Sequence, residues 1–171
     1  GNLRAIRDRF GNAVRITTGA GQANLSRIEA STGRWLAFTY APGGSGFKIQ
    51  TMQDNLGRTW TYAYDGGPEQ LQTVTDPEGG VTIYTYDGAF RMLTLRDARN
   101  IVFLTNEYDA NGRVFRQTQA DSTTFLMSYT LDGQGKVTQT DVTDPRALVR
   151  RLTFNAAGYV LTDTRAVGRP E

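Results

Sequence analysis

Residues 62–87 read YAYDGGPEQLQTVTDPEGGVTIYTYD. Two turn signals stand in this stretch: the pair Tyr64-Asp65, which returns as Tyr86-Asp87, and the tetrad Asp76-Pro77-Glu78-Gly79 between them. Asp at the first position of a turn accepts hydrogen bonds from nearby backbone N–H groups, Pro fits the second position, and Gly tolerates a positive φ. The stretch therefore predicts two strands and two turns, which make one β-hairpin repeat.

The aromatic–Asp pair recurs along most of the chain. Tyr64, Tyr86 and Tyr108 are 22 residues apart, and related slots follow 23 residues apart at Leu131 and Phe154, with Tyr40 lying 24 residues upstream of Tyr64. Self-similarity at such a period indicates a repeat architecture. The later copies share a glycine four residues after the aromatic or Leu, and these glycines are Gly112, Gly135 and Gly158.

A second marker alternates with the first. Six aspartates each open a predicted turn tetrad, and Gly33 fills the gap between the first two: Asp8, Asp54, Asp76, Asp97, Asp121 and Asp144. Between the markers, bulky residues occupy every second position, as in Trp60/Tyr62/Tyr64 and Thr82/Tyr84/Tyr86, while the opposite phase is rich in Thr. Period-2 patterning predicts strands with one bulky face.

These patterns predict an all-β chain of tandem antiparallel hairpins of about 22 residues, forming a curved and twisted sheet strip. We expect neighbouring hairpins to pair edge to edge, so that aromatic side chains stack across strands. Residues 1–171 are predicted to form a single array of about seven repeats without a separate catalytic domain. An isolated strip has two open edges, which favour edge-to-edge self-association.

The composition removes most catalytic chemistry. The chain has no Cys and no His, so thiolate or imidazole zinc sites and His-dependent catalytic triads are excluded. The twelve aspartates follow the turn period, which favours a structural role over a carboxylate pair of a glycosidase. Asp141 with Asp144, or Asp76 with Glu78, are only weak calcium candidates because no dense Asp-x-Asp-x-Asp loop is present. No catalytic residue, cofactor or metal is predicted, and the chain is expected not to be an enzyme.

Charge and hydropathy narrow the choice of partners. Seventeen arginines and two lysines are scattered along a chain of net charge +2, which argues against a nucleic-acid groove. No apolar stretch approaches the length of a membrane span. The glycine-rich Pro42–Gly46 lacks the Gly-Lys-Ser/Thr ending of a phosphate loop and is predicted to be a hairpin turn.

The motifs of residues 62–87, together with Tyr108-Asp109-Ala110-Asn111-Gly112-Arg113-Val114, resemble the YD repeat of the Rhs (rearrangement hot spot) family. The resemblance covers nearly the whole chain. It implies a β-sheet strip that spirals into a hollow shell, as in bacterial Rhs toxins, toxin-complex shell subunits and animal teneurins. The self-cleaving region and the toxin domain of that family have no counterpart here, so no catalytic residue is carried over.

The resemblance implies a structural segment of a shell that encloses a toxin or effector cargo. The expected partners are further repeats of the parent chain and an enclosed toxin domain. The expected location is secreted or at the cell surface, as part of a larger bacterial protein that a secretion system delivers. A carbohydrate- or cell-surface-binding module is the alternative, because periodic aromatic side chains can stack on sugars. The residues predicted to build the repeat are Tyr40, Trp60, Tyr62, Tyr64, Asp65, Asp76, Gly79, Tyr84, Tyr86, Asp87, Asp97, Tyr108, Asp109, Gly112, Gly135, Phe154 and Gly158.

Overall fold

The computed structural model describes residues 3–19, 24–41, 48–65 and 70–167, and within these ranges it contains strands and turns but no α-helix. The predicted turn at Pro42–Gly46 lies outside the described residues. The strands are β1 (Ala5–Arg7), β2 (Ala13–Thr18), β3 (Leu25–Ala30), β4 (Trp35–Tyr40), β5 (Ile49–Asp54), β6 (Thr59–Tyr64), β7 (Leu71–Thr75), β8 (Val81–Tyr86), β9 (Met92–Arg96), β10 (Val102–Tyr108), β11 (Val114–Gln119), β12 (Thr124–Leu131), β13 (Val137–Thr143), β14 (Val149–Phe154) and β15 (Val160–Thr164).

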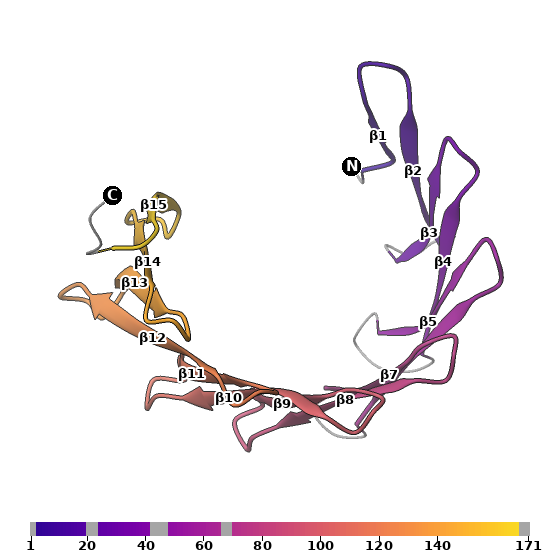
Figure 1. Cartoon of the computed structure of the whole chain (residues 1–171). Coiled ribbons are helices and arrows are strands. Elements are labelled where there is room, and N and C mark those ends of the chain that lie inside the picture. The colour runs from indigo at the N-terminus through magenta and orange to yellow at the C-terminus, as the bar shows by residue number, and fades with distance from the viewer. Residues whose placement is uncertain (1–2, 20–23, 42–47, 66–69, 168–171) are drawn as a thin grey trace. The chain divides into compact units, whose positions relative to one another are not determined.

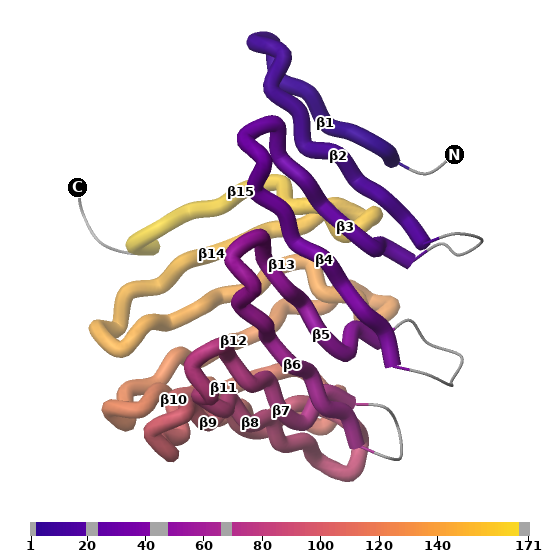
Figure 2. The backbone as a smooth tube through the Cα atoms, turned by 90° about the vertical axis from the view of Figure 1, so that its right-hand side faces the viewer, coloured from indigo at the N-terminus to yellow at the C-terminus, as the bar shows by residue number. Residues whose placement is uncertain are grey.

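The strands follow one another in chain order in a single open sheet, from β1 at one edge to β15 at the other (Figures 1 and 2). Each strand hydrogen-bonds to its sequence neighbours, and the neighbouring strands run antiparallel. β-Branched and aromatic residues at alternating positions suit such pleated, half-buried strands. The prediction of an all-β chain of tandem antiparallel hairpins is confirmed.

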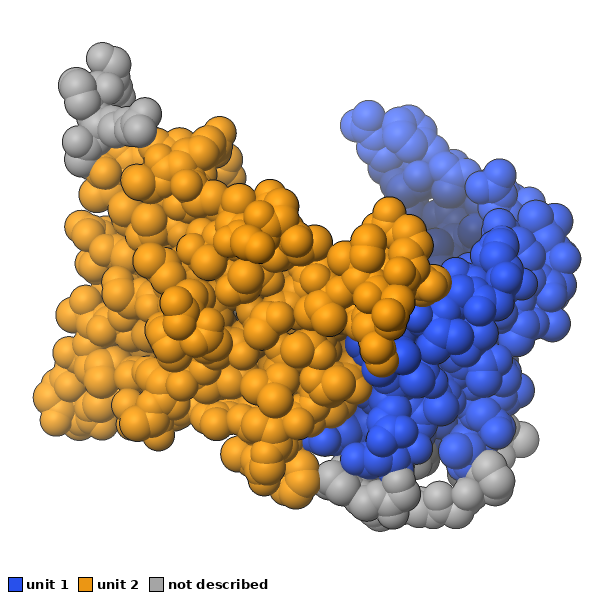
Figure 3. Space-filling view, turned by 60° about the horizontal axis from the view of Figure 1, so that its bottom comes forward, with its two compact units in different colours: residues 1–83 blue, residues 84–171 orange. Residues whose placement is uncertain are grey.

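The chain divides into two compact units, residues 1–83 (unit 1) and residues 84–171 (unit 2), which are coloured separately in Figure 3. Strands β1–β7 lie in unit 1, strands β9–β15 lie in unit 2, and β8 crosses the boundary. Within each unit, hairpins are added one after another along the sheet. The single array of about seven repeats stays a prediction.

Among the described residues the sheet has almost no buried core. Ala13 is the only buried hydrophobic residue there, and Asp54 and Asn106 are buried polar residues with 5% exposure each. Most strand residues are half-buried on a single layer, whereas domains usually pack two or more layers around a core. Because little apolar burial holds the strands together, loop contacts and cross-strand pairs must supply much of the local order.

A β-bulge recurs where an outgoing strand meets its return strand. Between Thr39 and Tyr40 of β4, the partner on β5 changes from Thr51 to Ile49, so one residue of β5 is extra. The same shift occurs in five further hairpins of this type, and the extra residues are Ser26, Gln50, Gln72, Phe115, Thr138 and Leu161. Bulges bend a strand and increase its local twist. The period-2 pattern of the sequence does not predict these bulges.

Aromatic side chains do not face one another directly where stacking was expected. Phe38 and Trp60 both pair with Met52, which stands between them, and Tyr62 pairs with Val74. The partners of these aromatic side chains on β5 and β7 are aliphatic. The expected aromatic stack is therefore an alternating aromatic–aliphatic row in this part of the sheet.

Candidate functional site

Eleven of the hairpin connections share one loop geometry. The first residue donates its N–H to the carbonyl of the fifth, and the fourth donates its N–H to the carbonyl of the first. Examples are the bonds from the Asp109 N–H to the Arg113 carbonyl (2.8 Å) and from the Gly112 N–H to the Asp109 carbonyl (3.0 Å). The fourth residue has a positive φ, which is 78° at Gly112. This is a type I turn followed by a left-handed residue, a common short hairpin connection. The loops begin at Asp8, Ala30, Asp54, Asp76, Asp87, Asp97, Asp109, Gln119, Asp132, Asp144 and Asn155.

The aspartate at the first position closes the loop from within. Asp109 Oδ1 accepts the N–H groups of Asn111 and Arg113, both at 2.9 Å. The same two bonds form at Asp76, Asp87 and Asp97. The two sequence markers, aromatic–Asp and Asp tetrad, are therefore one type of loop, which connects strands at both of their ends. Asp65 begins a longer connection, in which its Oδ1 accepts the N–H of Gln70 at 3.0 Å.

Asp121 was predicted to open a turn, and this prediction is wrong. The turn begins two residues earlier, because Ser122 N–H donates to the carbonyl of Gln119. Ser122 takes the positive-φ position with a φ of 65°. Asp121 occupies the third position instead, where its Oδ1 accepts the N–H and the hydroxyl of Thr123 at 3.0 and 2.7 Å.

A charged contact connects successive repeats in unit 2. The guanidinium of Arg91, four residues after Asp87, donates from Nε to Asp87 Oδ2 at 2.8 Å and lies 4.6 Å from the ring centre of Tyr108. In the next repeat Arg113 binds Asp109 Oδ2 at 2.8 Å and lies 5.0 Å from the ring centre of Tyr129. We call each set of carboxylate, guanidinium and ring a clasp. An arginine over an aromatic face gains cation–π energy.

The tyrosine of each clasp is also tied to the backbone. Tyr108 Oη donates to the carbonyl of Met92 at 2.6 Å, and Tyr129 Oη donates to that of Val114 at 2.6 Å. In both cases the acceptor is the first residue of the preceding strand. Unit 1 repeats this bond from Tyr40 to Leu25 and from Tyr64 to Ile49. The recurring tyrosine therefore anchors the start of one strand from the end region of the next.

The remaining predicted repeat residues lie on the strands or in the loops that the spacing indicated. Trp60 lies on β6 beneath Arg58, whose guanidinium is 5.9 Å from its ring, and Phe154 pairs with Val160. Tyr84 and Tyr86 lie on β8. The predicted glycines occupy the fourth loop position with positive φ, and they are Gly79, Gly112, Gly135 and Gly158.

The Thr-rich phase forms hydroxyl rows on the opposite face. In unit 1 a row of directly paired threonines crosses four strands: Thr39, Thr51, Thr61 and Thr75. The hydroxyls of Thr39 and Thr51 are 2.6 Å apart, and those of Thr85 and Thr94 in unit 2 repeat this distance. Cross-strand threonine pairs stabilise a sheet and fix its register.

The loop geometry lowers the pKa of many carboxyl groups. Backbone N–H donation from Arg91 and Arg113 holds the pKa values of Asp87 and Asp109 below the ordinary value, with the guanidinium groups contributing. The guanidinium of Arg58 is the main cause of the lowered pKa of Asp54. In contrast, burial raises the pKa of the Tyr64 and Tyr129 hydroxyls.

These shifts predict a stability plateau between about pH 5 and 9. The unfolded chain binds protons to its aspartates at a higher pH than the folded chain does, so their stabilisation is lost as the pH falls below about 4. The raised tyrosine pKa values act at the other end, and their stabilisation is lost as the pH rises above about 10. Melting temperature measured by circular dichroism across the pH range tests this. A D87N/D109N variant should show a flatter acid limb, and an unchanged melting temperature from pH 6 to 3 would contradict the account.

No catalytic or metal centre emerges in the described ranges. No group of three or more His, Cys, Asp or Glu side chains there could hold a metal ion. Of the weak calcium candidates, Asp141 binds the guanidinium of Arg151 and Asp144 binds that of Arg146, both through charged hydrogen bonds. In the part of the chain that the structure describes, no helix is long and apolar enough to cross a membrane.

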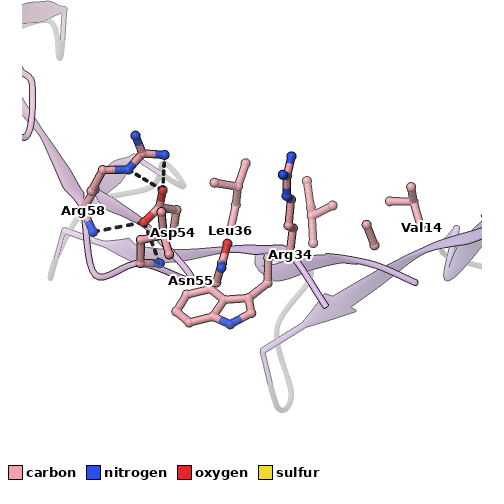
Figure 4. A pocket seen from close by; sticks show the side chains of 10 residues that line it. Val14, Arg34, Leu36, Asp54, Asn55 and Arg58 are labelled. Carbon is pink, nitrogen blue, oxygen red and sulfur yellow. Dashed lines mark hydrogen bonds and ion pairs between the residues drawn. The ribbon is translucent and has the colours of Figure 1, made fainter. Parts of the chain in front are cut away.

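A groove of about 560 Å³ lies on the bulky face of unit 1. Figure 4 shows Leu36, Arg34 and Val14 rising from the same side of the sheet beside Asp54, which is bonded to Arg58. Asp54 Oδ2 accepts from Arg58 Nε at 2.7 Å. Aliphatic side chains form the floor of the groove, and Asp54 at one end of its rim is already bonded to Arg58. The groove therefore presents no reactive group.

Comparison with known proteins identifies the repeat. The family model of the RHS repeat matches residues 70–101, the stretch that contains β7, β8, β9 and the loops at Asp76, Asp87 and Asp97. Residues 70–101 thus match the RHS repeat, and the resemblance to the Rhs family is confirmed over this stretch. A search of curated proteins by sequence found no match.

Solved structures show where the same fold occurs. The crystal structure of TcdB2-TccC3-Cdc42 matches 93% of this chain and 9% of that chain, with 12% identity and a TM-score of 0.54. A Tc holotoxin pore from Photorhabdus luminescens matches 96% of this chain and 12% of that chain, with 10% identity and a TM-score of 0.41. A porin-like protein from Bacteroides uniformis matches 94% and 86% of the two chains, with 15% identity and a TM-score of 0.42. The fold comparison rests on the first structure, of which this chain spans about a tenth.

Proposed function

We propose that this chain is a structural segment of an Rhs-type wall that encloses a polypeptide cargo, such as a toxin or effector domain. The observation that carries the proposal is the single-layered sheet of 15 strands in chain order, with almost no buried core among its described residues. A sheet of this kind gains little from folding back on itself. Such a sheet is suited to separating two environments, one on each of its faces.

The clasps give such a wall its mechanical continuity. Each one joins a loop to an aromatic ring of the next repeat, so contacts pass from neighbour to neighbour along unit 2. Arrays of this type gain stability as a sum of repeat terms and neighbour terms. Length can therefore be added without enlarging a core, which is what an enclosing wall requires.

The electrostatics support a structural role over a catalytic one. A general acid at neutral pH needs a raised carboxyl pKa, whereas Asp54, Asp87 and Asp109 have lowered values. Their oxygens already accept loop N–H groups and guanidinium donors. The repeat geometry uses these carboxylates fully as loop anchors.

Sugar binding receives less support from the same geometry. A sugar ring stacks on an open aromatic face, yet cations already lie over the rings of Tyr64, Tyr108 and Tyr129. Their hydroxyls are bonded to backbone carbonyls as well. We therefore assign these tyrosines a structural role in the wall. Secretion as part of a larger toxin protein is the location that this role implies.

Limited proteolysis of the full-length gene product tests the enclosing role. We expect a segment outside the repeats to resist protease in the native protein and to be cut once the wall is unfolded. An R91A/R113A variant, which breaks both clasps, should expose that segment at a lower temperature than the parent. An R99A/R146A variant is the matched control, because these two exposed arginines pair only within their own loops. Equal cleavage of that segment in the native and the unfolded protein would contradict the proposal.

A further inference from the structure

One loop of unit 1 departs from the chemistry of the repeat at its first position. Four of the hairpin loops in the described ranges carry arginine at the fifth position, and these arginines are Arg34, Arg58, Arg91 and Arg113. In three of the loops the first residue is Asp, whose Oδ2 accepts a bond from the arginine Nε at 2.7, 2.8 and 2.8 Å. In the fourth loop the first residue is Ala30, so Arg34 has no carboxylate partner within its own loop.

The backbone of the Ala30 loop keeps the shape that surrounds a carboxylate in the other loops. The Ala30 N–H donates to the Arg34 carbonyl at 2.9 Å, and the Gly33 N–H donates to the Ala30 carbonyl at 3.0 Å. Gly33 has a φ of 81°, close to the 80° of Gly57 in the Asp54 loop. The loop therefore forms without the aspartate side chain that supports its neighbour.

Two N–H groups of this loop have no hydrogen-bond partner among the described residues. In the Asp54 loop, Oδ1 accepts the N–H groups of the third and fifth residues at 3.0 Å each. The corresponding groups of the Ala30 loop belong to Thr32 and Arg34, and neither donates to a described residue. Backbone N–H groups that converge in a turn form a concavity for an anion. Two N–H groups and one guanidinium are therefore available to an anion at the place of the absent aspartate side chain.

The Ala30 loop borders the groove of about 560 Å³ on the bulky face of unit 1. Ala30 and Arg34 are among its lining residues, and Figure 4 shows Arg34 extending from the same side of the sheet as Leu36 and Val14. Together with Ile28, these two aliphatic side chains provide an apolar floor. The floor crosses β2, β3 and β4, each of which has a described strand on both sides, so the groove does not depend on an end of the array.

The acids in the loops on either side of this site are held within those loops. Asp54 is only 5% exposed, and its Oδ2 accepts from Arg58 Nε at 2.7 Å. On the other side, Asp8 accepts the Asn12 N–H at 2.9 Å and the Asn12 Nδ2 at 2.8 Å. The guanidinium of Arg34, between these two loops, makes no hydrogen bond or ion pair with a described residue. An unpaired positive charge therefore stands beside an apolar floor.

We propose that the Ala30 loop and its groove bind an aliphatic monocarboxylate. The carboxylate takes the place of the absent aspartate side chain and accepts from the two loop N–H groups and the Arg34 guanidinium, in bonds that charge makes strong. The carbon chain lies on the aliphatic floor, where its burial adds affinity. This binding role is independent of the wall role, because it needs only unit 1 and a small ligand.

Nuclear magnetic resonance of the isotope-labelled 171-residue chain, titrated with sodium hexanoate at neutral pH, tests the proposal. We expect saturable shifts of the Thr32 and Arg34 amide signals, which sodium chloride does not produce. Hexanoate should bind at least about tenfold more tightly than acetate, because its longer chain covers the floor. Hexanol has the same chain without a carboxylate and should bind at least about tenfold more weakly than hexanoate.

Exchanging Asp and Ala between loops tests the site in both directions. Ala30→Asp supplies the carboxylate from the chain itself, so it should abolish the hexanoate-induced shifts and raise the melting temperature. Asp109→Ala frees a loop of unit 2 in the same way, and it should add a second, acetate-binding site with saturable shifts of the Asn111 and Arg113 amide signals. Such a gain of binding cannot arise from misfolding.

Two arginine variants complete the test. Arg34→Gln should weaken hexanoate binding at least about tenfold. Arg15→Gln is the matched control, because Arg15 pairs with Glu29 on the opposite face and its loss should leave binding unchanged. The proposal is overturned if Ala30→Asp binds hexanoate as tightly as the parent, or if hexanol binds as tightly as hexanoate. It is also overturned if both arginine variants weaken binding equally, or if folded Asp109→Ala gains no second site.

Discussion

Replacing Tyr108 with Ala is expected to lower the free energy of unfolding by about 3 kcal/mol. The substitution removes a half-buried ring under Arg91 and the hydroxyl bond to the Met92 carbonyl. It also leaves Asn106, a buried side chain whose Nδ2 donates to the same carbonyl at 3.1 Å, beside a void. One side chain therefore supports two strands and one clasp.

Two matched variants separate the parts of this effect. Tyr108→Phe deletes the hydroxyl alone and should cost about 1 kcal/mol. Tyr159→Ala removes a tyrosine that is 72% exposed and should cost less than about 0.5 kcal/mol. Urea unfolding followed by circular dichroism measures all three. If Tyr108→Ala were as stable as Tyr159→Ala, the clasp would make no contribution to the free energy of unfolding.

Gly112→Val is expected to cost about 2–3 kcal/mol. Gly112 has a φ of 78°, which a β-branched residue adopts only with strain. A Cβ there would also stand 3.3 Å from Arg91 Nη1, so the guanidinium would have to shift away from its position between Asp87 and Tyr108. The loop and the clasp are thus disturbed by a single change.

Gly135→Val is the control for backbone strain. Its φ is 79°, and a Cβ at that position meets nothing within 4 Å. We expect this variant to lose about 1–2 kcal/mol, so the difference between the two valine variants reports the displacement of Arg91. Equal losses, measured by urea unfolding, would show that Arg91 shifts without consequence.

The loops could be predicted because their chemistry is local. Asp at the first position and Gly at the fourth, as in Asp109 and Gly112, are enough to predict the turn from four residues of sequence. The turn near Asp121 could not be placed from residue types, because Gln119 opens it and Ser122 takes the left-handed position, and neither residue is a typical choice. A residue type alone could not place the start of this loop.

The clasps, bulges and unpaired arginines needed the structure. Arg91 and Tyr108 are distant in sequence, and an arginine that follows a turn gives no sign of which ring its guanidinium covers. A bulge shifts register by one residue inside a strand, which leaves only a small trace in a period-2 pattern. Counting charges gave near balance, whereas the described arginines of unit 2 interact with nearby groups and the guanidinium groups of Arg4, Arg7, Arg15 and Arg34 in unit 1 do not.

A cryo-electron microscopy structure of the full-length gene product tests most directly whether this sheet is part of an enclosing wall. We expect further hairpins to continue the sheet in chain order, and the resulting wall to surround density for a segment outside the repeats. A structure in which these 171 residues stand as an isolated sheet, with nothing enclosed, would contradict it.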